Sequence, residues 1–330
     1  GPLADGLIAA WAYLGKGDMR TALEHFDEVA DQRGLRSFGL YHKALALASV
    51  GDFESANAIF AGNEDGPLQS TRSGTLAWAE VMSQLERNDD AVALIDDVFI
   101  ADLDPEVAHL RERLAAGEQV PFSRIQTARE GLAEVFYSLG RALMSDTGDE
   151  YTLLYARVAE RLNPAHVDAI LMSAELLESL GRYELATETY RRVPRDNPAF
   201  HAAELGRAES LRRAGKTDAA VEVLKQLAET HPDLPSVHVA SGDLNRQLEN
   251  YEAAVAAYNR ALEIFSANET DQWFVHYARA ICYERLDQWD KAEADFRRAL
   301  ELNPGHPQVL NYLGYSLVEH QMKLDEALEM

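Results

Sequence analysis

Residues 167–200 read VDAILMSAELLESLGRYELATETYRRVPRDNPAF, and this 34-residue stretch decides how the whole chain is interpreted. Ile170 and Ala174 are four residues apart, which places them on one face of a predicted helix. Gly181 interrupts that helix, and Ala186 begins the apolar face of a second one. The stretch therefore predicts two antiparallel helices joined by a tight turn.

The same marks return at a fixed distance along the chain. Pro164, Pro198 and Pro232 are each 34 residues apart, and Pro304 follows after a step of 34 and a step of 38. Two sets of small residues keep this phase. The first set is Gly140, Ala174, Ala208, Gly242, Ala280 and Gly314, and the second is Ala186, Ala220, Ala254 and Ala292. Such a period predicts an all-α array of stacked helix pairs, with a longer loop at 265–271 where four extra residues fall.

The N-terminal part repeats in its own register. Gly17 and Gly51 mark two predicted helix pairs, and a third pair over about 76–100 lacks the glycine turn. Pro105 opens an additional helix that Gly117 ends. We expect an exposed linker at 118–123, with Ser123 capping a helix over about 124–144.

The two arrays are out of phase with each other. Gly51 and Gly181 are 130 residues apart, whereas four periods need 136. We therefore predict an N-terminal array at 3–100, a joint at 101–123 and a C-terminal array at 124–330. Residues 324–330 end inside a predicted helix, so we expect the chain to be a piece of a longer protein.

Composition narrows the classes of function. The 330 residues are 47% hydrophobic and 8% aromatic, enough to fold. The formal charge of −24 argues against nucleic-acid binding and against attraction to anionic membranes. No apolar run approaches the roughly 20 residues of a membrane span. The acidic balance favours a protein partner with basic segments, and the compartment stays open between cytoplasm and, if an upstream signal was removed, a bacterial periplasm.

The repeat over about 279–304 carries the clearest pattern of a known family. Its marks are Arg279-Ala280, Tyr283, Trp289, Ala292, Phe296, Ala299 and Pro304. With these residues the chain resembles the tetratricopeptide repeat (TPR) family, over about 3–63 and 133–330. The resemblance implies a right-handed α-solenoid whose concave face, lined by first helices, holds a peptide or helix of a partner protein. The lysine and asparagine set with which some members hold a C-terminal carboxylate is missing, so that mode is not expected.

No catalytic or metal-binding pattern in the sequence has the context that its chemistry needs. Gly215-Lys216-Thr217 ends like a phosphate-binding loop, but position 210 is serine where such a loop needs glycine, and no strand precedes it. The ten histidines lack metal-ligand spacing, and Cys282 has no evident catalytic partner. We expect no enzyme activity, no metal and no cofactor.

The residues expected to contact a partner lie beside the buried stripe of the first helices and mix aromatic, arginine and acidic types. They are Tyr137, Arg141, Glu175, Arg212, Asp243, Arg246, Phe274, Tyr277, Asn311 and Tyr315. The favoured function is a bacterial-style scaffold, adaptor or assembly factor that binds a segment with basic and apolar residues. The alternative is the repeat portion of a larger enzyme or membrane-anchored protein whose active part lies elsewhere. RNA binding is disfavoured by the negative charge.

Overall fold

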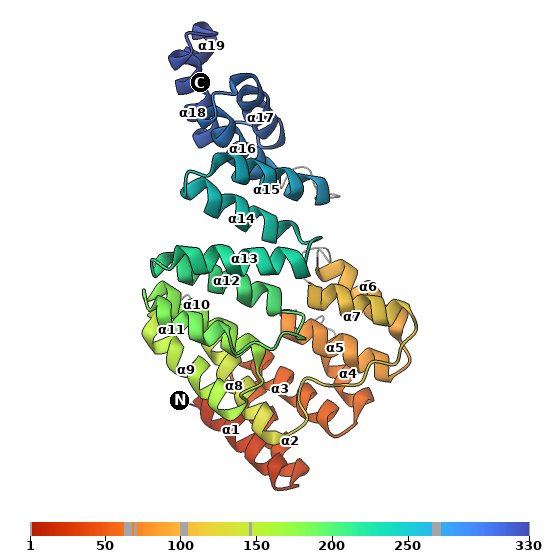
Figure 1. Ribbon diagram of the computed structural model, residues 1–330. Coiled ribbons are helices and arrows are strands. Elements are labelled where there is room, and N and C mark those ends of the chain that lie inside the picture. The colour runs from red at the N-terminus through yellow and green to blue at the C-terminus, as the bar shows by residue number, and fades with distance from the viewer. Residues whose placement is uncertain are drawn as a thin grey trace. The chain divides into compact units, whose positions relative to one another are not determined.

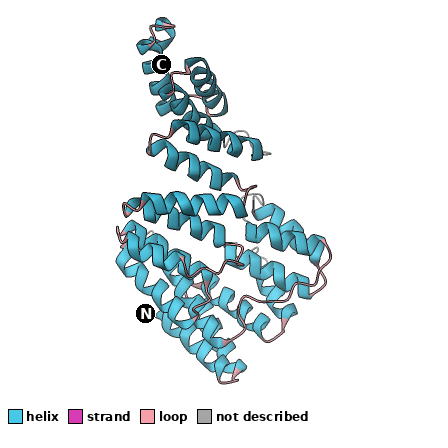
Figure 2. Cartoon of the chain, viewed as in Figure 1, coloured by secondary structure: helices cyan, strands magenta, loops and turns pink. Residues whose placement is uncertain are grey.

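The computed structural model describes residues 2–62, 68, 71–99, 105–144, 147–265 and 272–329 (Figure 1). Helices joined by turns make up these residues, with no strand among them, which confirms the predicted all-α solenoid class (Figure 2). Apart from Phe265, the longer loop expected at 265–271 lies outside the described residues.

First and second helices alternate along the chain, as the period predicts. The first helices are α1 (Pro2–Gly15), α3 (Arg36–Ser49), α5 (Arg72–Gln84), α8 (Ala128–Leu143), α10 (Val167–Ser179), α12 (Phe200–Arg213), α14 (Pro235–Gln247), α16 (Trp273–Arg285) and α18 (Pro307–Glu319). The second helices are α2 (Met19–Ala30), α4 (Phe53–Ala61), α6 (Asn88–Val98), α9 (Asp149–Leu162), α11 (Tyr183–Tyr190), α13 (Thr217–Thr230), α15 (Tyr251–Ile264), α17 (Trp289–Leu302) and α19 (Leu324–Glu329). The predicted additional helix, α7 (Pro105–Ala115), stands outside this alternation.

The recurring small residues lie where helices cross closely. Ala174, Ala186 and Ala220 are completely buried. A Cβ atom built on Gly242 would lie 2.5 Å from the ring of Tyr258, so only glycine fits at that crossing. The predicted buried face of the helix pairs is confirmed at these positions.

The turn between paired helices needs one residue in the left-handed region. Gly51 and Gly181 take it with φ of 86° and 69°. In other repeats the position is held by Glu86, Glu249 and Asp287, with φ of 60°, 61° and 57°. The turn therefore survives the loss of glycine in the third pair, at the cost of a conformation that L-residues disfavour.

The chain forms two compact units, residues 1–203 (unit 1) and 204–330 (unit 2), and each is described by itself. This division differs from the boundaries at 100 and 124 expected from the lost phase, which remain predictions. Within unit 1, α8 packs against α1 and α3. A Cβ on Gly131 would lie 2.3 Å from the indole of Trp11, so α8 and α1 touch almost at the backbone.

Residues 118–127, called the strap below, run from α7 to α8 as an anchored segment. Val120 is buried; its N–H donates to Ser83 Oγ at 2.8 Å and its carbonyl accepts from Gln84 Nε2 at 2.6 Å. Residues 118, 119, 121 and 123 are exposed, as expected for 118–123. Val120 is buried and Phe122 is half-buried, against that expectation. Val120 therefore holds the segment to α5.

The expectation that Ser123 caps the helix after the strap is wrong. Its N–H donates to Glu80 Oε2 at 2.8 Å, whereas Thr127 caps α8 in a reciprocal capping box with Glu130. The sequence Thr-Ala-Arg-Glu at 127–130 is a usual signature of that box, and Ser123 is instead held by the carboxylate of Glu80 on α5.

Candidate functional site

In unit 1 the inner face of the first helices is covered by the chain itself. This inner face is formed by Leu7 and Trp11 on α1, Leu45 on α3 and Glu80 on α5. The apolar members share one core with residues of the strap and α8, among them Ile125, Val135 and Leu139. Glu80 accepts a hydrogen bond from Arg124 Nε at 3.1 Å. The strap and α8 therefore cover these side chains of α1, α3 and α5.

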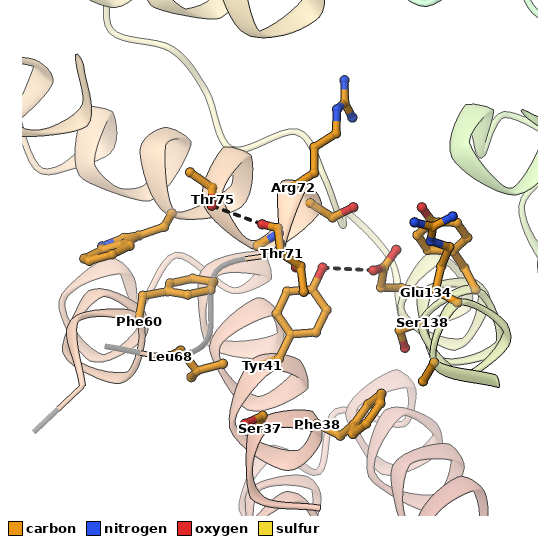
Figure 3. Close-up of a pocket in the computed structure, with 16 residues that line it drawn as sticks. Ser37, Phe38, Tyr41, Phe60, Leu68, Thr71, Arg72, Thr75, Glu134 and Ser138 are labelled. Atoms are coloured by element: carbon orange, nitrogen blue, oxygen red, sulfur yellow. Dashed lines mark hydrogen bonds between the residues drawn. The ribbon is translucent and has the colours of Figure 1, made fainter. Parts of the chain in front are cut away.

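A cavity of about 520 Å³ remains beside α8, between it and helices α3 and α5 (Figure 3). It is lined by Ser37, Phe38, Tyr41, Phe60, Leu68, Thr71, Arg72, Ser73, Gly74, Thr75, Trp78, Glu134, Tyr137, Ser138, Arg141 and Ala142. All of these residues belong to unit 1. The volume lies in the range of ordinary ligand sites.

Aromatic rings form one end of the cavity. Phe60 and Trp78 stack with ring centroids 6.2 Å apart, and Trp78 Nε1 donates to Asn57 Oδ1 at 2.9 Å. Figure 3 shows Tyr41 between Phe60 and Glu134, with its hydroxyl directed at the carboxylate. This end offers an apolar surface whose nearby polar atoms are already hydrogen-bonded.

A buried carboxylate marks the other end. Glu134 accepts from the Tyr41 hydroxyl at 2.9 Å and lies 3.0 Å from His166 Nε2. Burial raises the pKa of the Glu134 carboxyl, but the hydrogen bond and charge of His166 outweigh it and leave the pKa below its ordinary value. Burial raises the pKa of the Tyr41 and Tyr137 hydroxyls, so both stay protonated at neutral pH and act as donors.

Two arginines line the cavity in different ways. Arg72 Nη2 lies 2.6 Å from Glu106 Oε2, and its side chain points away from Phe60 in Figure 3. Arg141 is exposed, and its Nη1 lies 3.4 Å from the thioether of Met144, a weak acceptor. Arg141 also lies close enough to Glu175 to offset part of the rise that desolvation causes in the pKa of that carboxyl.

Of the residues predicted to bind a partner, those in unit 1 fall around this cavity. Tyr137 and Arg141 line it, and the ring of Tyr137 lies 4.9 Å from that of His166. Glu175, on α10, is exposed beside Arg141. The structure thus brings these three positions together.

The predicted residues of unit 2 lie on successive first helices. Arg212 pairs with Glu209 at 2.6 Å, and Arg246 pairs with Asp243 at 3.3 Å. Tyr277 packs beside Tyr312, with ring centroids 6.0 Å apart. Burial raises the pKa of the Tyr277 hydroxyl, and the charge of Arg246 offsets part of that rise. The remaining three, Phe274, Asn311 and Tyr315, are exposed. Arg212, Asp243 and Arg246 therefore hold contacts within the fold as well as facing solvent in part.

Sequence reasoning missed the polar groups of unit 1 that meet across distant helices. Glu134 stands between Ala133 and Val135 in an apolar helix, and a carboxylate in such a place was a usable signal. Trp11 Nε1 donates to His42 Nδ1 at 3.2 Å, and His42 Nε2 lies 3.2 Å from Ser138 Oγ. Nothing in the local sequence indicates these pairings.

Other features have a structural role. Gly215, at φ 75°, forms the inter-helix turn before α13. Burial raises the pKa of the Cys282 thiol to about 11, so it stays protonated and unreactive at neutral pH. The described residues contain no group of three histidine, cysteine, aspartate or glutamate side chains placed to hold a metal ion. None of the helices in the described ranges is both long and apolar enough to cross a membrane.

Known proteins share the repeat. Three sequence models of the tetratricopeptide repeat match residues 168–199, 205–269 and 273–306. Solved structures with a similar fold include MamA, residues 41 to its end, from Desulfovibrio magneticus RS-1 (17% identity, TM-score 0.45, 53% of this chain and 97% of that one). Another is TTC0263, a thermophilic TPR protein of Thermus thermophilus (21% identity, TM-score 0.44, 56% and 99%). YrrB, titled a TPR protein with an unusual peptide-binding site, is 14% identical with a TM-score of 0.41, over 54% and 90%.

The matched residues coincide with the helix pairs from α10 to α17. Repeats of this kind support a general role as a scaffold for protein–protein interaction. Residues 168–199, 205–269 and 273–306 of the chain are therefore tetratricopeptide repeats.

Proposed function

We propose that the chain is a non-catalytic adaptor or assembly factor that holds an extended or helical segment of another protein on the first helices of unit 2. The observation that carries this proposal is the exposure of large aromatic side chains there. Tyr315 on α18 is 66% exposed and Phe274 on α16 is 38% exposed. Aromatic residues of this kind are the usual anchors of protein interfaces.

The contrast with unit 1 supports the choice of unit 2. In unit 1 the strap and α8 already cover the inner face of α1, α3 and α5. In unit 2 the predicted contact residues Phe274, Asn311 and Tyr315 are exposed. A partner segment can therefore contact these side chains of unit 2 without first displacing another part of the chain.

Charge supports a partner with basic as well as apolar residues. Residues 204–330 include 22 acidic and 13 basic side chains. Asp243 and Glu284 stand on the first helices of unit 2, and although Arg246 and Ser316 already contact them, their charge favours a basic ligand. We expect this charge to speed association, and added salt to slow it.

A selection from a random twelve-residue peptide library displayed against the intact chain tests the proposal. We expect one class of clones rich in lysine, arginine and large apolar residues. Replacing both Phe274 and Tyr315 by alanine lowers the affinity of this class about tenfold or more, because interface anchors commonly contribute that much. The matched control is Leu154→Ala on α9, which removes an apolar side chain that is 61% exposed in unit 1. A selection without any clone sensitive to the double variant contradicts the proposal.

A further inference from the structure

The cavity of unit 1 depends on the way the chain returns on itself. Its walls come from α3 and α5 in the N-terminal pairs and from α8, which follows the strap. Successive repeats of an open array do not create such a site, because each contacts only its neighbours. The cavity is therefore a feature of this chain and not of the repeat as such.

The shape and walls favour one large apolar side chain as the occupant. Phe38, Phe60 and Trp78 present ring surface, and Leu68 adds an aliphatic side chain. The indole N–H of Trp78 already donates to Asn57, so it does not need a hydrogen-bond acceptor on the ligand. An aromatic or long aliphatic group desolvates these rings without leaving a buried polar atom unsatisfied.

At the α8 end, the polar groups that remain for a ligand are donors. Glu134, the carboxylate in the lining, is already engaged by Tyr41 and His166. Arg72 is engaged by Glu106 and points away from the rings. The guanidinium of Arg141 and the protonated hydroxyl of Tyr137 remain for an incoming acceptor.

The acidity of the whole chain does not cancel this local preference. Exposed charges are largely screened beyond about 8–10 Å at physiological salt. A ligand carboxylate in contact with Arg141 and Tyr137 therefore interacts with that guanidinium and with the nearby carboxylates of Glu175, Glu134 and Asp168, and only weakly with the more distant acids.

We propose that this cavity binds an acidic-apolar segment of a partner protein. A phenylalanine, tryptophan, leucine or methionine side chain enters against the stacked rings of Phe60 and Trp78, and a nearby aspartate or glutamate of the same segment pairs with Arg141 and accepts from Tyr137. The inference rests on the proposed scaffold function. It adds to the site on unit 2, which favours a basic ligand, a second site on unit 1 that favours an acidic one. One partner segment with a basic part and an acidic part, or two segments, can then engage the two units.

The same peptide selection, read for a second class of clones, tests the inference. We expect peptides in which a large apolar residue stands within two positions of aspartate or glutamate. Arg141→Glu lowers their affinity tenfold or more, because a charged hydrogen bond is lost and a like charge is introduced. Ser37→Trp, at an exposed position of the lining, fills the cavity and has the same effect.

Two controls separate a lost site from a lost fold. Arg182→Glu makes the same charge change at an exposed arginine of unit 1 outside the cavity, and it leaves the affinity within about twofold. In both cavity variants, the basic class of clones keeps its wild-type affinity, because its site lies in unit 2. Circular dichroism of each variant checks that the helix content is unchanged.

The outcomes distinguish the two proposals. If acidic-apolar clones are absent, or bind Arg141→Glu and Ser37→Trp as tightly as the wild type, the cavity site is overturned while the scaffold function stands on the basic class. If Arg141→Glu shifts the selected clones from acidic to basic neighbours of the apolar residue, the assignment of Arg141 is supported directly. If neither class is found, both proposals fall.

Discussion

The guanidinium of Arg124 lies between two carboxylates, with its Nε 3.1 Å from Glu80 Oε1 and its Nη2 2.9 Å from Glu106 Oε1. Glu80 belongs to α5, Glu106 to α7 and Arg124 to the strap. The side chain of Glu80 is only 5% exposed, so Arg124 provides most of the charge that compensates it. One residue of the strap thus joins two helices from different parts of unit 1.

Arg124→Ala should loosen the strap. Removing one partner of a buried ion pair leaves an uncompensated charge, and we expect a loss of about 2–4 kcal/mol in the free energy of unfolding. Limited proteolysis should then cut within 118–127 more readily than in the wild type, where the hydrogen bonds of the strap are expected to slow cleavage. Arg111→Ala, which removes an exposed pair with Asp96, is the matched control and should cost less than about 1 kcal/mol. Equal cleavage of the wild type and Arg124→Ala would show that these hydrogen bonds do not hold the strap.

Gly131→Ala should weaken the contact between α8 and α1. The added methyl group would lie 2.3 Å from the indole of Trp11, which must move, and we expect a loss of about 1–3 kcal/mol. Gly148→Ala is the control, because its methyl group meets nothing within 4 Å; only the change of N-cap residue before α9 remains, and it should cost less than about 1 kcal/mol. Denaturant midpoints measure both changes, and equal midpoints would contradict the close approach.

His42 should make stability depend on pH. Burial lowers its pKa from 6.5 to about 4, so between these values the unfolded chain binds a proton that the folded chain does not. Above about pH 6.5, His42 is neutral in both states and the free energy of unfolding is at its full value. As pH falls towards 4, only the unfolded chain takes up the proton, and the free energy of unfolding falls by on the order of 3 kcal/mol. His166, whose pKa is raised by Glu134 despite its burial, acts in the opposite direction above pH 6.5.

The variant His42→Gln isolates this effect. A glutamine can accept from Trp11 and donate to Ser138, but it does not titrate. We expect the stability difference between wild type and variant to shrink between pH 6.5 and 4, as measured by urea unfolding at each pH. A difference that is constant over this range would mean that His42 is not buried in its neutral form.

Glu249→Gly should stabilise unit 2. Glu249 holds a φ of 61° at an inter-helix turn, a conformation that costs an L-residue about 1 kcal/mol and glycine very little. We expect a gain of about 0.5–1 kcal/mol in thermal or denaturant unfolding. Ala256→Gly, at an exposed site inside α15, is the control and should lower the free energy of unfolding by about 1 kcal/mol. A destabilised Glu249→Gly variant would show that the glutamate side chain contributes more than the turn costs.

The repeat phase predicted the local fold well because its signals are local. Ala174 and Ala186 are buried as their spacing requires, and Gly117 ends α7 at φ 77°. The helix predicted from Ser123 begins four residues before α8, because the capping box that starts the helix lies at Thr127.

The site was harder to predict because its parts are far apart in sequence. The cavity joins Phe60 and Trp78 to Tyr137, and no period relates α8 to α3 and α5. Tyr137 and Arg141 were named from their place on a first helix, whereas Glu134 and His166 were not, since their meeting depends on how α8 packs. Such contacts follow from tertiary packing, which a pattern along the chain does not encode.

The contact between α1 and α8 also bears on how unit 1 assembles. Open repeat arrays fold through contacts between neighbours, so terminal repeats can unravel one at a time. In unit 1, Trp11 meets Gly131 across about 120 residues of sequence. Closing so long a loop has a large entropic cost that local contacts cannot offset early, which slows folding. Once closed, the loop ties the first repeat to the fourth helix pair, so loss of either end releases both, and unit 1 should unfold as one cooperative body.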